Sequence, residues 1–167
     1  MRARTEGEVT VARIEVPGEA GDEVTRLWKL VPEQGAAYAA FTEVLYGRTA
    51  IPAREREIAR MTIALLNDCK VCQRFRVPGL ERRGVDEELY AAVADWRTTP
   101  HFTARERLSA EYAQRFVIDH QAFDDEFWDR MREAYSPAEV ADLTMMMAAW
   151  MGFGRMTAVL QLDADER

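Results

Sequence analysis

The sequence predicts an all-α fold, a helical bundle formed by one main domain within 167 residues. Two observations lead to this prediction: apolar residues recur at helical spacing along most of the chain, and helix start signals stand between these segments. In addition, the sequence contains no glycine-rich phosphate loop, no alternation of strand and helix patterns, and no internal repeat beyond helical hairpins. A chain of this length is long enough to bury a substantial core.

The first 21 residues differ in pattern from the rest of the chain. Their β-branched residues alternate loosely, and Pro17-Gly18 ends this run. We therefore expect residues 1–21 to form an N-terminal arm, either extended along a neighbouring subunit or disordered. Residues 22–167 are expected to form a single all-helical domain.

Proline, glycine and capping residues predict where the helices of this domain begin and end. A short apolar segment over 24–30 precedes a helix with Pro32 in its first turn and Gly47 at its end. Pro52 opens the next helix, and Asn67-Asp68 interrupts it. Two capping-box patterns follow, together with an aspartate suited to an N-cap. The later helices are expected to begin at Cys69, Asp86, Thr103, Asp124 and Ser136, and the last four to end near Trp96, Ile118, Tyr135 and Leu160.

Charge and hydropathy exclude several classes of protein. The formal net charge of −7 argues against nonspecific binding to nucleic acid, and no basic cluster of the kind used on anionic membranes is present. The N-terminal residues contain no apolar stretch that could serve as a secretory signal, so we expect a cytoplasmic protein. The stretch from Leu143 to Gly154 is uncharged but too short to cross a bilayer. We expect it to lie in a buried helix, with its methionines filling the core.

Cys69-Lys70-Val71-Cys72 holds the only two cysteines of the chain. On a helix, positions i and i+3 share a face, and the unpaired N–H groups of a helix N-terminus favour a thiolate. One sulfur could then attack a substrate while the other resolves the product as a disulfide. A zinc site is less well supported, because His101 and His120 stand at spacings that fit no common finger pattern. The structural alternative is that the two cysteines are small buried residues with no chemical role.

Glu57 stands twelve residues before the cysteine pair, in a charged stretch that opens a mostly apolar helix. Its helical neighbours Met61 and Ala64 are apolar, so we expect Glu57 to face inward, where it could accept a proton from the dithiol. The structural alternative is an ion pair with Arg54 or Arg60, each about one helical turn away.

Four features of the chain occur in a recognisable order: an Arg-Glu pair opening a helix, an apolar run, a Cys-x-x-Cys motif, and a glycine followed by an acidic helix start. They stand at Arg56-Glu57, Ile58–Leu66, Cys69–Cys72 and Gly84–Glu88. In this order they resemble the carboxymuconolactone decarboxylase family and, within it, the alkylhydroperoxidase D-like (AhpD-like) branch. A looser resemblance extends from about residue 32 to residue 160.

The resemblance implies an all-helical homo-oligomer, commonly a trimer or a multiple of one. In the peroxidase branch the second cysteine attacks the peroxide and the first resolves it, which here implies attack by Cys72 and resolution by Cys69. The family's proton relay joins the glutamate at Glu57 to a histidine four residues beyond the second cysteine, where this chain has Arg76. A further histidine can lie between the cysteines, where this chain has Val71. Because arginine stays protonated and cannot shuttle a proton, we expect weak peroxidase activity.

Three further residues are candidates for binding substrate or stabilising a thiolate, although Arg76 and His120 could also be plain surface residues. Arg76 could lower the pKa of a thiol or attract an anionic substrate. Arg155 stands within an apolar helix and, if buried, requires a partner such as Glu57 or a bound anion. His120 lies in a turn-like segment and could enter the site from another helix or subunit.

We therefore expect an enzyme, a thiol-dependent oxidoreductase that reduces a hydroperoxide or a disulfide. An external dithiol would regenerate the cysteines, and no metal or organic cofactor is required. One alternative is a decarboxylase-like enzyme acting on a small carboxylated lactone, with Arg76 or Arg155 holding carboxylates. Another is a non-enzymatic oligomeric module whose cysteines only sense the redox state.

Overall fold

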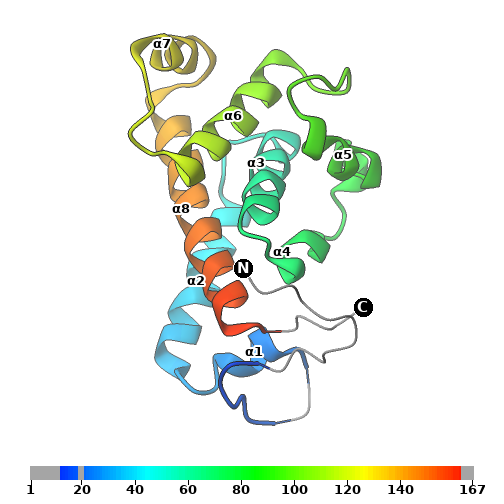
Figure 1. The fold of residues 1–167 in the computed structure, drawn as a ribbon, viewed down its shortest axis with the longest axis vertical. Coiled ribbons are helices and arrows are strands. Elements are labelled where there is room, and N and C mark those ends of the chain that lie inside the picture. The colour runs from blue at the N-terminus through cyan, green and yellow to red at the C-terminus, as the bar shows by residue number, and fades with distance from the viewer. Residues whose placement is uncertain (1–11, 19–20, 163–167) are drawn as a thin grey trace, which may run out of the picture.

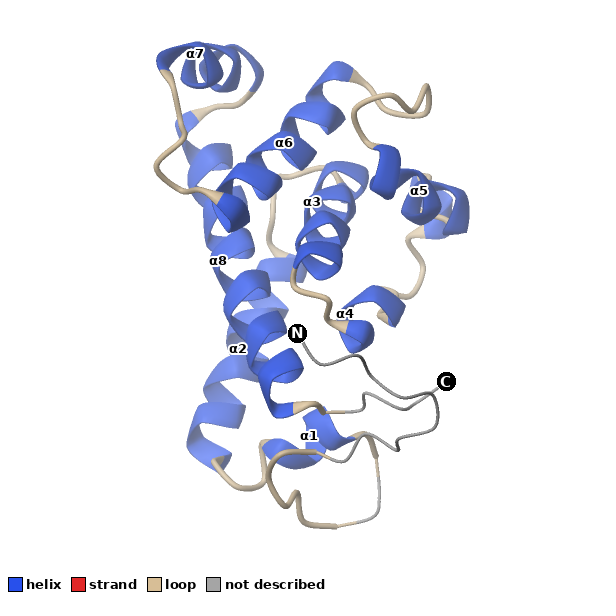
Figure 2. Cartoon of the chain, viewed as in Figure 1, coloured by secondary structure: helices blue, strands red, loops and turns tan. Residues whose placement is uncertain are grey.

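The computed structural model describes residues 12–18 and 21–162, and all regular structure in these ranges is helical (Figure 2). This confirms the predicted all-α fold. The α-helices are α1 (Glu23–Leu27), α2 (Pro32–Gly47), α3 (Ala53–Leu66), α4 (Lys70–Arg74), α5 (Glu87–Ala92), α6 (Ala104–Ile118), α7 (Asp125–Ala134) and α8 (Pro137–Leu160), and the short 3-10 helices are η1 (Glu81–Arg83) and η2 (Val93–Asp95).

Helix α3 lies at the centre of the molecule, packed against α6 and α8 (Figure 1). Eleven of its fourteen residues are buried. Ile63 packs into a core with side chains from α6, α7 and α8, whereas Ile58 packs into a second core with α5 and η2. Helix α8 extends along much of the molecule, with α7 near one end and α1 and α2 near the other (Figure 1). The central position of α3 therefore places both its apolar and its charged residues inside the protein.

The capping residues act where the sequence predicts them. Thr103 and Ser136 each form a complete capping box at the start of α6 and α8. Asp86 accepts a hydrogen bond from the backbone N–H of Leu89 at 2.9 Å and so caps α5. One boundary differs from the prediction: the α-helical hydrogen bonding ends at Ala92, and η2 completes the segment, as 3-10 turns often do at helix ends.

The buried charges of α3 are paired with arginines. Glu55 accepts a hydrogen bond from Arg105 at 3.0 Å, and Glu57 accepts one from Arg60 at 2.6 Å. Arg54 pairs with Glu106 of α6. Since an unpaired buried charge is costly, these pairs explain how a charged stretch can open the central helix.

The described part of the N-terminal segment lies against its own chain. The backbone N–H of Arg13 donates to the carbonyl of Leu160 at 2.8 Å, and Arg26 donates to the carbonyl of Gly18. The remaining residues of the predicted arm, 1–11 and 19–20, lie outside the described residues. Through Arg13 and Gly18, residues 12–18 thus contact both the end of α8 and helix α1.

Helix α8 is the one helix, among the described residues, that is long and apolar enough by length and composition to cross a membrane. Its Leu143, Met146 and Met147 are fully buried in the protein, and the helix packs on α3, as a core helix does. A single helix of this kind is therefore weak support for a membrane protein. The expectation that the methionines fill the core holds for Met146 and Met147, but Met145 is 54% exposed.

Candidate active site

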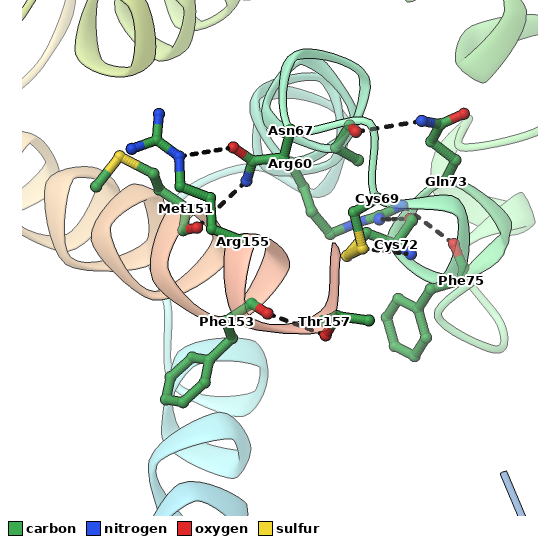
Figure 3. The surroundings of a disulfide bond; sticks show 11 residues. Arg60, Asn67, Cys69, Cys72, Gln73, Phe75, Met151, Phe153, Arg155 and Thr157 are labelled. Atoms are coloured by element: carbon green, nitrogen blue, oxygen red, sulfur yellow. Dashed lines mark hydrogen bonds between the residues drawn. A yellow bond between two sulfur atoms is a disulfide. The ribbon is translucent and has the colours of Figure 1, made fainter. Parts of the chain in front are cut away.

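The two cysteines lie at the start of the short helix α4, joined as a disulfide with their Cα atoms 5.2 Å apart (Figure 3). Cys69 is the N-cap of α4, and its sulfur accepts a hydrogen bond from the backbone N–H of Cys72 at 3.2 Å. Asp68 turns the chain from α3 into α4 with a φ of 50°, a left-handed conformation that aspartate tolerates better than most residues. Local sequence therefore brings the sulfurs together, as the spacing predicts.

The two sulfurs differ in their access to a cavity of about 330 Å³ beside α4. Cys72 lines this cavity, whereas Cys69 does not and is 1% exposed. Cys72 is therefore the cysteine that a small molecule in the cavity could reach.

The cavity walls come from five parts of the fold. Besides Cys72, α4 and the residues that follow it supply Val71 and Phe75, α3 supplies Arg60 and Ala64, and the other walls come from α1, α2 and α8. The lining is mostly apolar and rich in aromatic rings. The lining residues from these three helices and the α1 cap are Asp22, Val24, Thr25, Tyr38, Thr42, Leu45, Tyr46, Ala149, Trp150, Phe153, Gly154 and Thr157.

Gly154 allows α8 to approach the disulfide closely. A Cβ atom at this position would lie 3.5 Å from the sulfur of Cys72 and 2.9 Å from the side-chain nitrogen of Asn67. Asn67 holds α8 to the end of α3 by donating to the carbonyl of Met151 at 3.2 Å (Figure 3). A residue without a side chain is thus used where the wall of the cavity meets the sulfur.

Behind this cavity lies a buried ionic network centred on Glu57, which is fully inaccessible to solvent. Its carboxylate accepts hydrogen bonds from Arg60 at 2.6 Å, from the Tyr90 hydroxyl at 3.0 Å and from Arg56 at 3.4 Å. Arg60 in turn donates to the carbonyls of Cys72 at 2.7 Å and Phe75 at 3.1 Å. Arg60 therefore connects Glu57 directly to the backbone of the reactive segment.

Two tyrosines near this network are held in their protonated form. Burial raises the pKa of the Tyr46 hydroxyl to about 12, against a smaller opposing effect of the Arg60 charge. Burial and the nearby Glu57 carboxylate also raise the pKa of Tyr90. Both hydroxyls are thus hydrogen-bond donors at physiological pH.

The structure brings Cys69, Cys72 and Glu57 into one region, with Glu57 facing inward as expected. Of the two partners considered for Glu57, Arg60 is the one that binds it. The expected general-base contact is indirect, because Glu57 does not line the cavity and reaches Cys72 through Arg60.

The two arginine candidates lie elsewhere. Arg76 forms an ion pair with Glu87 at 2.6 Å and covers the ring of Tyr90, and it does not line the cavity. Arg155 is exposed and donates to Asn67, so the expectation of a buried arginine paired with Glu57 is wrong. It lies on the outward side of α8. Because α8 has few polar residues, its sequence does not show which side faces solvent.

Neither histidine lines the cavity. His120 is exposed in the connection between α6 and α7, and His101 is exposed beside Glu88. Within the described residues, no group of three or more His, Cys, Asp or Glu side chains is arranged to hold a metal ion.

A second hollow of about 750 Å³ lies along α6, bordered by Trp96, Arg115 and Arg130. It is larger than the cavity at Cys72 but contains neither cysteine. Of the arginines in its lining, Arg115 and Arg130 are each paired with Glu111 at 2.8 Å. The position of Cys72 therefore favours the smaller cavity as the candidate active site.

Sequence reasoning missed Tyr46 and the connecting role of Arg60. Arg60 stands one turn after Glu57, so its pairing with Glu57 was accessible, but its bonds to the carbonyls of Cys72 and Phe75 were not. Tyr46 belongs to a different helix, and no spacing rule relates it to the cysteines.

The model of the family described as "Carboxymuconolactone decarboxylase family" matches residues 32–115, about half of the chain. The Escherichia coli (strain K12) protein YnjA is 25% identical over 110 residues, which make up 66% of this chain and 60% of YnjA. This chain therefore spans less than two thirds of the length of that relative.

Two solved structures share the fold. A protein of unknown function from Agrobacterium tumefaciens, proposed to be the antioxidant defence protein AhpD, has a TM-score of 0.74 at 18% identity, over 90% of this chain and 96% of that protein. The debrominase Bmp8, solved as a cysteine-to-alanine variant with 2,3,4-tribromopyrrole, has a TM-score of 0.72 at 14% identity, over 84% and 75%. Taken with the family match, they lead to one conclusion: this chain belongs to the carboxymuconolactone decarboxylase family and has the AhpD-like fold.

Proposed function

We propose that this protein is a thiol-dependent oxidoreductase that reduces a hydroperoxide, or a disulfide, at the Cys69–Cys72 pair. The observation that carries the proposal is the difference between the two sulfurs: Cys72 lines the cavity and Cys69 is buried behind it. An attacking thiolate must meet substrate, whereas a resolving thiol need only meet its partner. Cys72 is accordingly the nucleophile and Cys69 the resolving cysteine.

In the proposed reaction the Cys72 thiolate attacks one peroxide oxygen, which breaks the O–O bond and releases an alcohol once the leaving oxygen gains a proton. The resulting sulfenic acid condenses with the Cys69 thiol, forming the disulfide and water. An external dithiol then reduces the disulfide by exchange. Glu57 takes the thiol proton through water, while Arg60 holds Glu57 beside the backbone of Cys72. Turnover is weak because Arg76, at the place of the relay histidine, cannot shuttle protons. The need for a dithiol donor fits a cytoplasmic protein.

The two cysteines should respond differently to substitution. Reduced wild-type protein treated with one equivalent of cumene hydroperoxide is expected to lose two hydrogens on a single peptide holding both cysteines. Cys69→Ser should accumulate a sulfenic acid at Cys72, trapped by dimedone and seen by mass spectrometry. Cys72→Ser should consume no hydroperoxide. Two thiols that persist in the wild type, or a sulfenic acid formed at Cys69, would contradict the assignment. Steady consumption with excess dithiothreitol separates an enzyme from a sensor.

A second candidate is reductive dehalogenation of an aromatic compound. The aromatic lining of the cavity favours it, and the debrominase Bmp8 shares the fold. Here Cys72 would take the halogen and Cys69 would displace halide, so that two thiols become a disulfide and the aromatic carbon gains a proton. Bromide release from a bromopyrrole by the reduced wild type, absent from Cys72→Ser, tests this candidate.

The structure lends less support to decarboxylation of a carboxylated lactone. The two arginines considered for holding carboxylates, Arg76 and Arg155, do not line the cavity. The arginine that does, Arg60, directs N–H groups to Glu57 and to two backbone carbonyls. The charge of this arginine is thus already paired with Glu57.

We also propose that the protein assembles as a homo-oligomer through α8, as a trimer or a multiple of one. Exposed residues on this helix recur at alternating steps of four and three, the spacing of a seam between packed helices. Met145 and Val159 of this seam are 54% and 71% exposed. We call these residues the α8 stripe: Ala141, Met145, Ala148, Gly152, Arg155 and Val159.

A charge placed in the α8 stripe should weaken the assembly. Ala148→Glu is expected to shift the molar mass measured by light scattering towards that of a single chain, because the carboxylate would be buried without a partner. Ala91→Glu, at an exposed alanine of α5, serves as the control and should leave the mass unchanged. A wild-type protein that is a monomer at working concentration would contradict the proposal.

A further inference from the structure

A residue that can protonate the departing oxygen is missing from the reaction described above. Neither His101 nor His120 lines the cavity, and Arg76 lies outside it. Reduction of a hydroperoxide leaves an alkoxide, a much stronger base than the thiolate that attacks, so a positioned acid is valuable at this step.

We propose that Tyr46 is this acid, an inference that rests on the proposed function. Tyr46 lines the same cavity as Cys72, from the last turn of α2. Its ring lies 6.3 Å from that of Phe75, between ring centroids, and Figure 3 shows Phe75 beside the disulfide. Tyr46 therefore stands at the end of the cavity where the peroxide bond would be broken.

The hydroxyl of Tyr46 is oriented and still has a proton to give. The indole N–H of Trp150 donates to it at 3.0 Å, which fixes its position and leaves the proton available. No acceptor in the described part of the chain takes that proton. The guanidinium of Arg56 lies 5.1 Å from the ring centroid and would stabilise the phenolate that forms briefly. The raised pKa of Tyr46 is in keeping with this role, since it keeps the group protonated before the reaction.

Other donors in the cavity wall are less suited. Arg60 uses its N–H groups on Glu57 and two carbonyls, and the Thr157 hydroxyl donates to the carbonyl of Phe153 at 3.0 Å. Thr42 is an aliphatic alcohol and a weaker acid than a phenol. Tyr38 is a phenol, but its ring packs 4.2 Å from Phe153, which projects away from the disulfide (Figure 3).

The Cys72 thiolate forms an S–O bond to the terminal peroxide oxygen while the O–O bond breaks, and the electron pair of that bond leaves on the alkoxide oxygen. Tyr46 gives its proton to the alkoxide, so an alcohol departs and a phenolate remains. The phenolate regains a proton from water, and Cys69 then displaces hydroxide, which leaves as water, from the Cys72 sulfenic acid.

The test compares oxidants whose leaving groups differ in basicity. Reduced wild type, Tyr46→Phe and Tyr112→Phe are each mixed with cumene hydroperoxide, which leaves an alkoxide, and with peroxybenzoic acid, which leaves a stable carboxylate. Thiol loss is followed in a single turnover. We expect Tyr46→Phe to slow the first reaction by about 10²-fold, the lower end for a positioned acid, and to leave the second unchanged. Tyr112→Phe, at a tyrosine of α6 that does not line the cavity, should affect neither.

Equal slowing of both oxidants by Tyr46→Phe, or equal slowing of the hydroperoxide by the two tyrosine variants, would overturn the role of Tyr46 while the proposed function stands. Unchanged hydroperoxide reduction in Tyr46→Phe would have the same meaning. If wild type forms no disulfide with cumene hydroperoxide above the Cys72→Ser background, the proposed function fails, and the role of Tyr46 fails with it.

Discussion

Replacement of Arg60 by leucine is expected to lower the free energy of unfolding by about 3–5 kcal/mol, the usual cost of removing one partner from a buried ion pair. Arg60 is 3% exposed, and the carboxylate of Glu57 is fully buried. Arg56 stays near Glu57 at 3.4 Å, so a loss near the lower end is expected. The variant also frees the carbonyls of Cys72 and Phe75, which should loosen α4.

Arg76→Leu provides a matched control. Arg76 also lies over the ring of Tyr90, but its partner Glu87 has a side chain that is 77% exposed. An exposed ion pair of this kind contributes about 0–1 kcal/mol. Urea unfolding followed by circular dichroism should therefore separate the two variants clearly. Equal losses would mean that Arg60 does not hold the network together.

Replacement of Glu57 by glutamine is expected to slow the reaction of the Cys72 thiol with a test disulfide by about 10²-fold at neutral pH, the lower end for loss of a general base. Glutamine keeps the shape of the side chain but cannot accept the proton. The protein should stay folded and lose stability, because Arg56 and Arg60 then lack their counter-charge.

Glu55→Gln separates this loss of stability from the chemistry. Glu55 is also buried in α3, at 6% exposure, but its partner is Arg105 rather than Arg60. It should lose stability and keep wild-type thiol reactivity. The rate is best measured from pH 6 to 9 in reduced protein. An unchanged or faster rate in Glu57→Gln would assign Glu57 a purely structural role. If Glu57 is not the base, loss of its negative charge leaves the positive charge of Arg60 unbalanced, and that charge favours the Cys72 thiolate.

The helices and the reactive pair were predictable because their signals are local. Capping residues such as Ser136 act on the N–H groups of their own turn, and the cysteine spacing is set within a single turn. The spacing of apolar residues along a helix does not show whether another element covers a given face of that helix. Val44 and Leu65 fit an apolar stripe yet are 49% and 40% exposed. Arg155 was misplaced for the same reason: α8 is apolar nearly all round, so its sequence does not show which side faces the core.

The cavity was not predictable, because it depends on contacts between distant parts of the chain. Tyr46 in α2 and Trp150 in α8 are joined by a hydrogen bond across 104 positions of sequence. Such a pair carries no spacing signal. Glu57 could be placed inward from its apolar neighbours, but the bonds of Arg60 to α4 depend on how α4 folds back on α3.

The origin of the cavity walls bears on how such proteins could diverge. The family match covers residues 32–115, which include both cysteines, Glu57, Arg60 and Tyr46. Two of the five walls lie outside that region: the start of α1, with Asp22 and Thr25, and the part of α8 around Phe153. Changes in these flanking segments would reshape the space offered to a ligand without touching the thiol chemistry. One inherited reaction could in this way be offered to different molecules, by altering the enclosure and keeping the reactive centre.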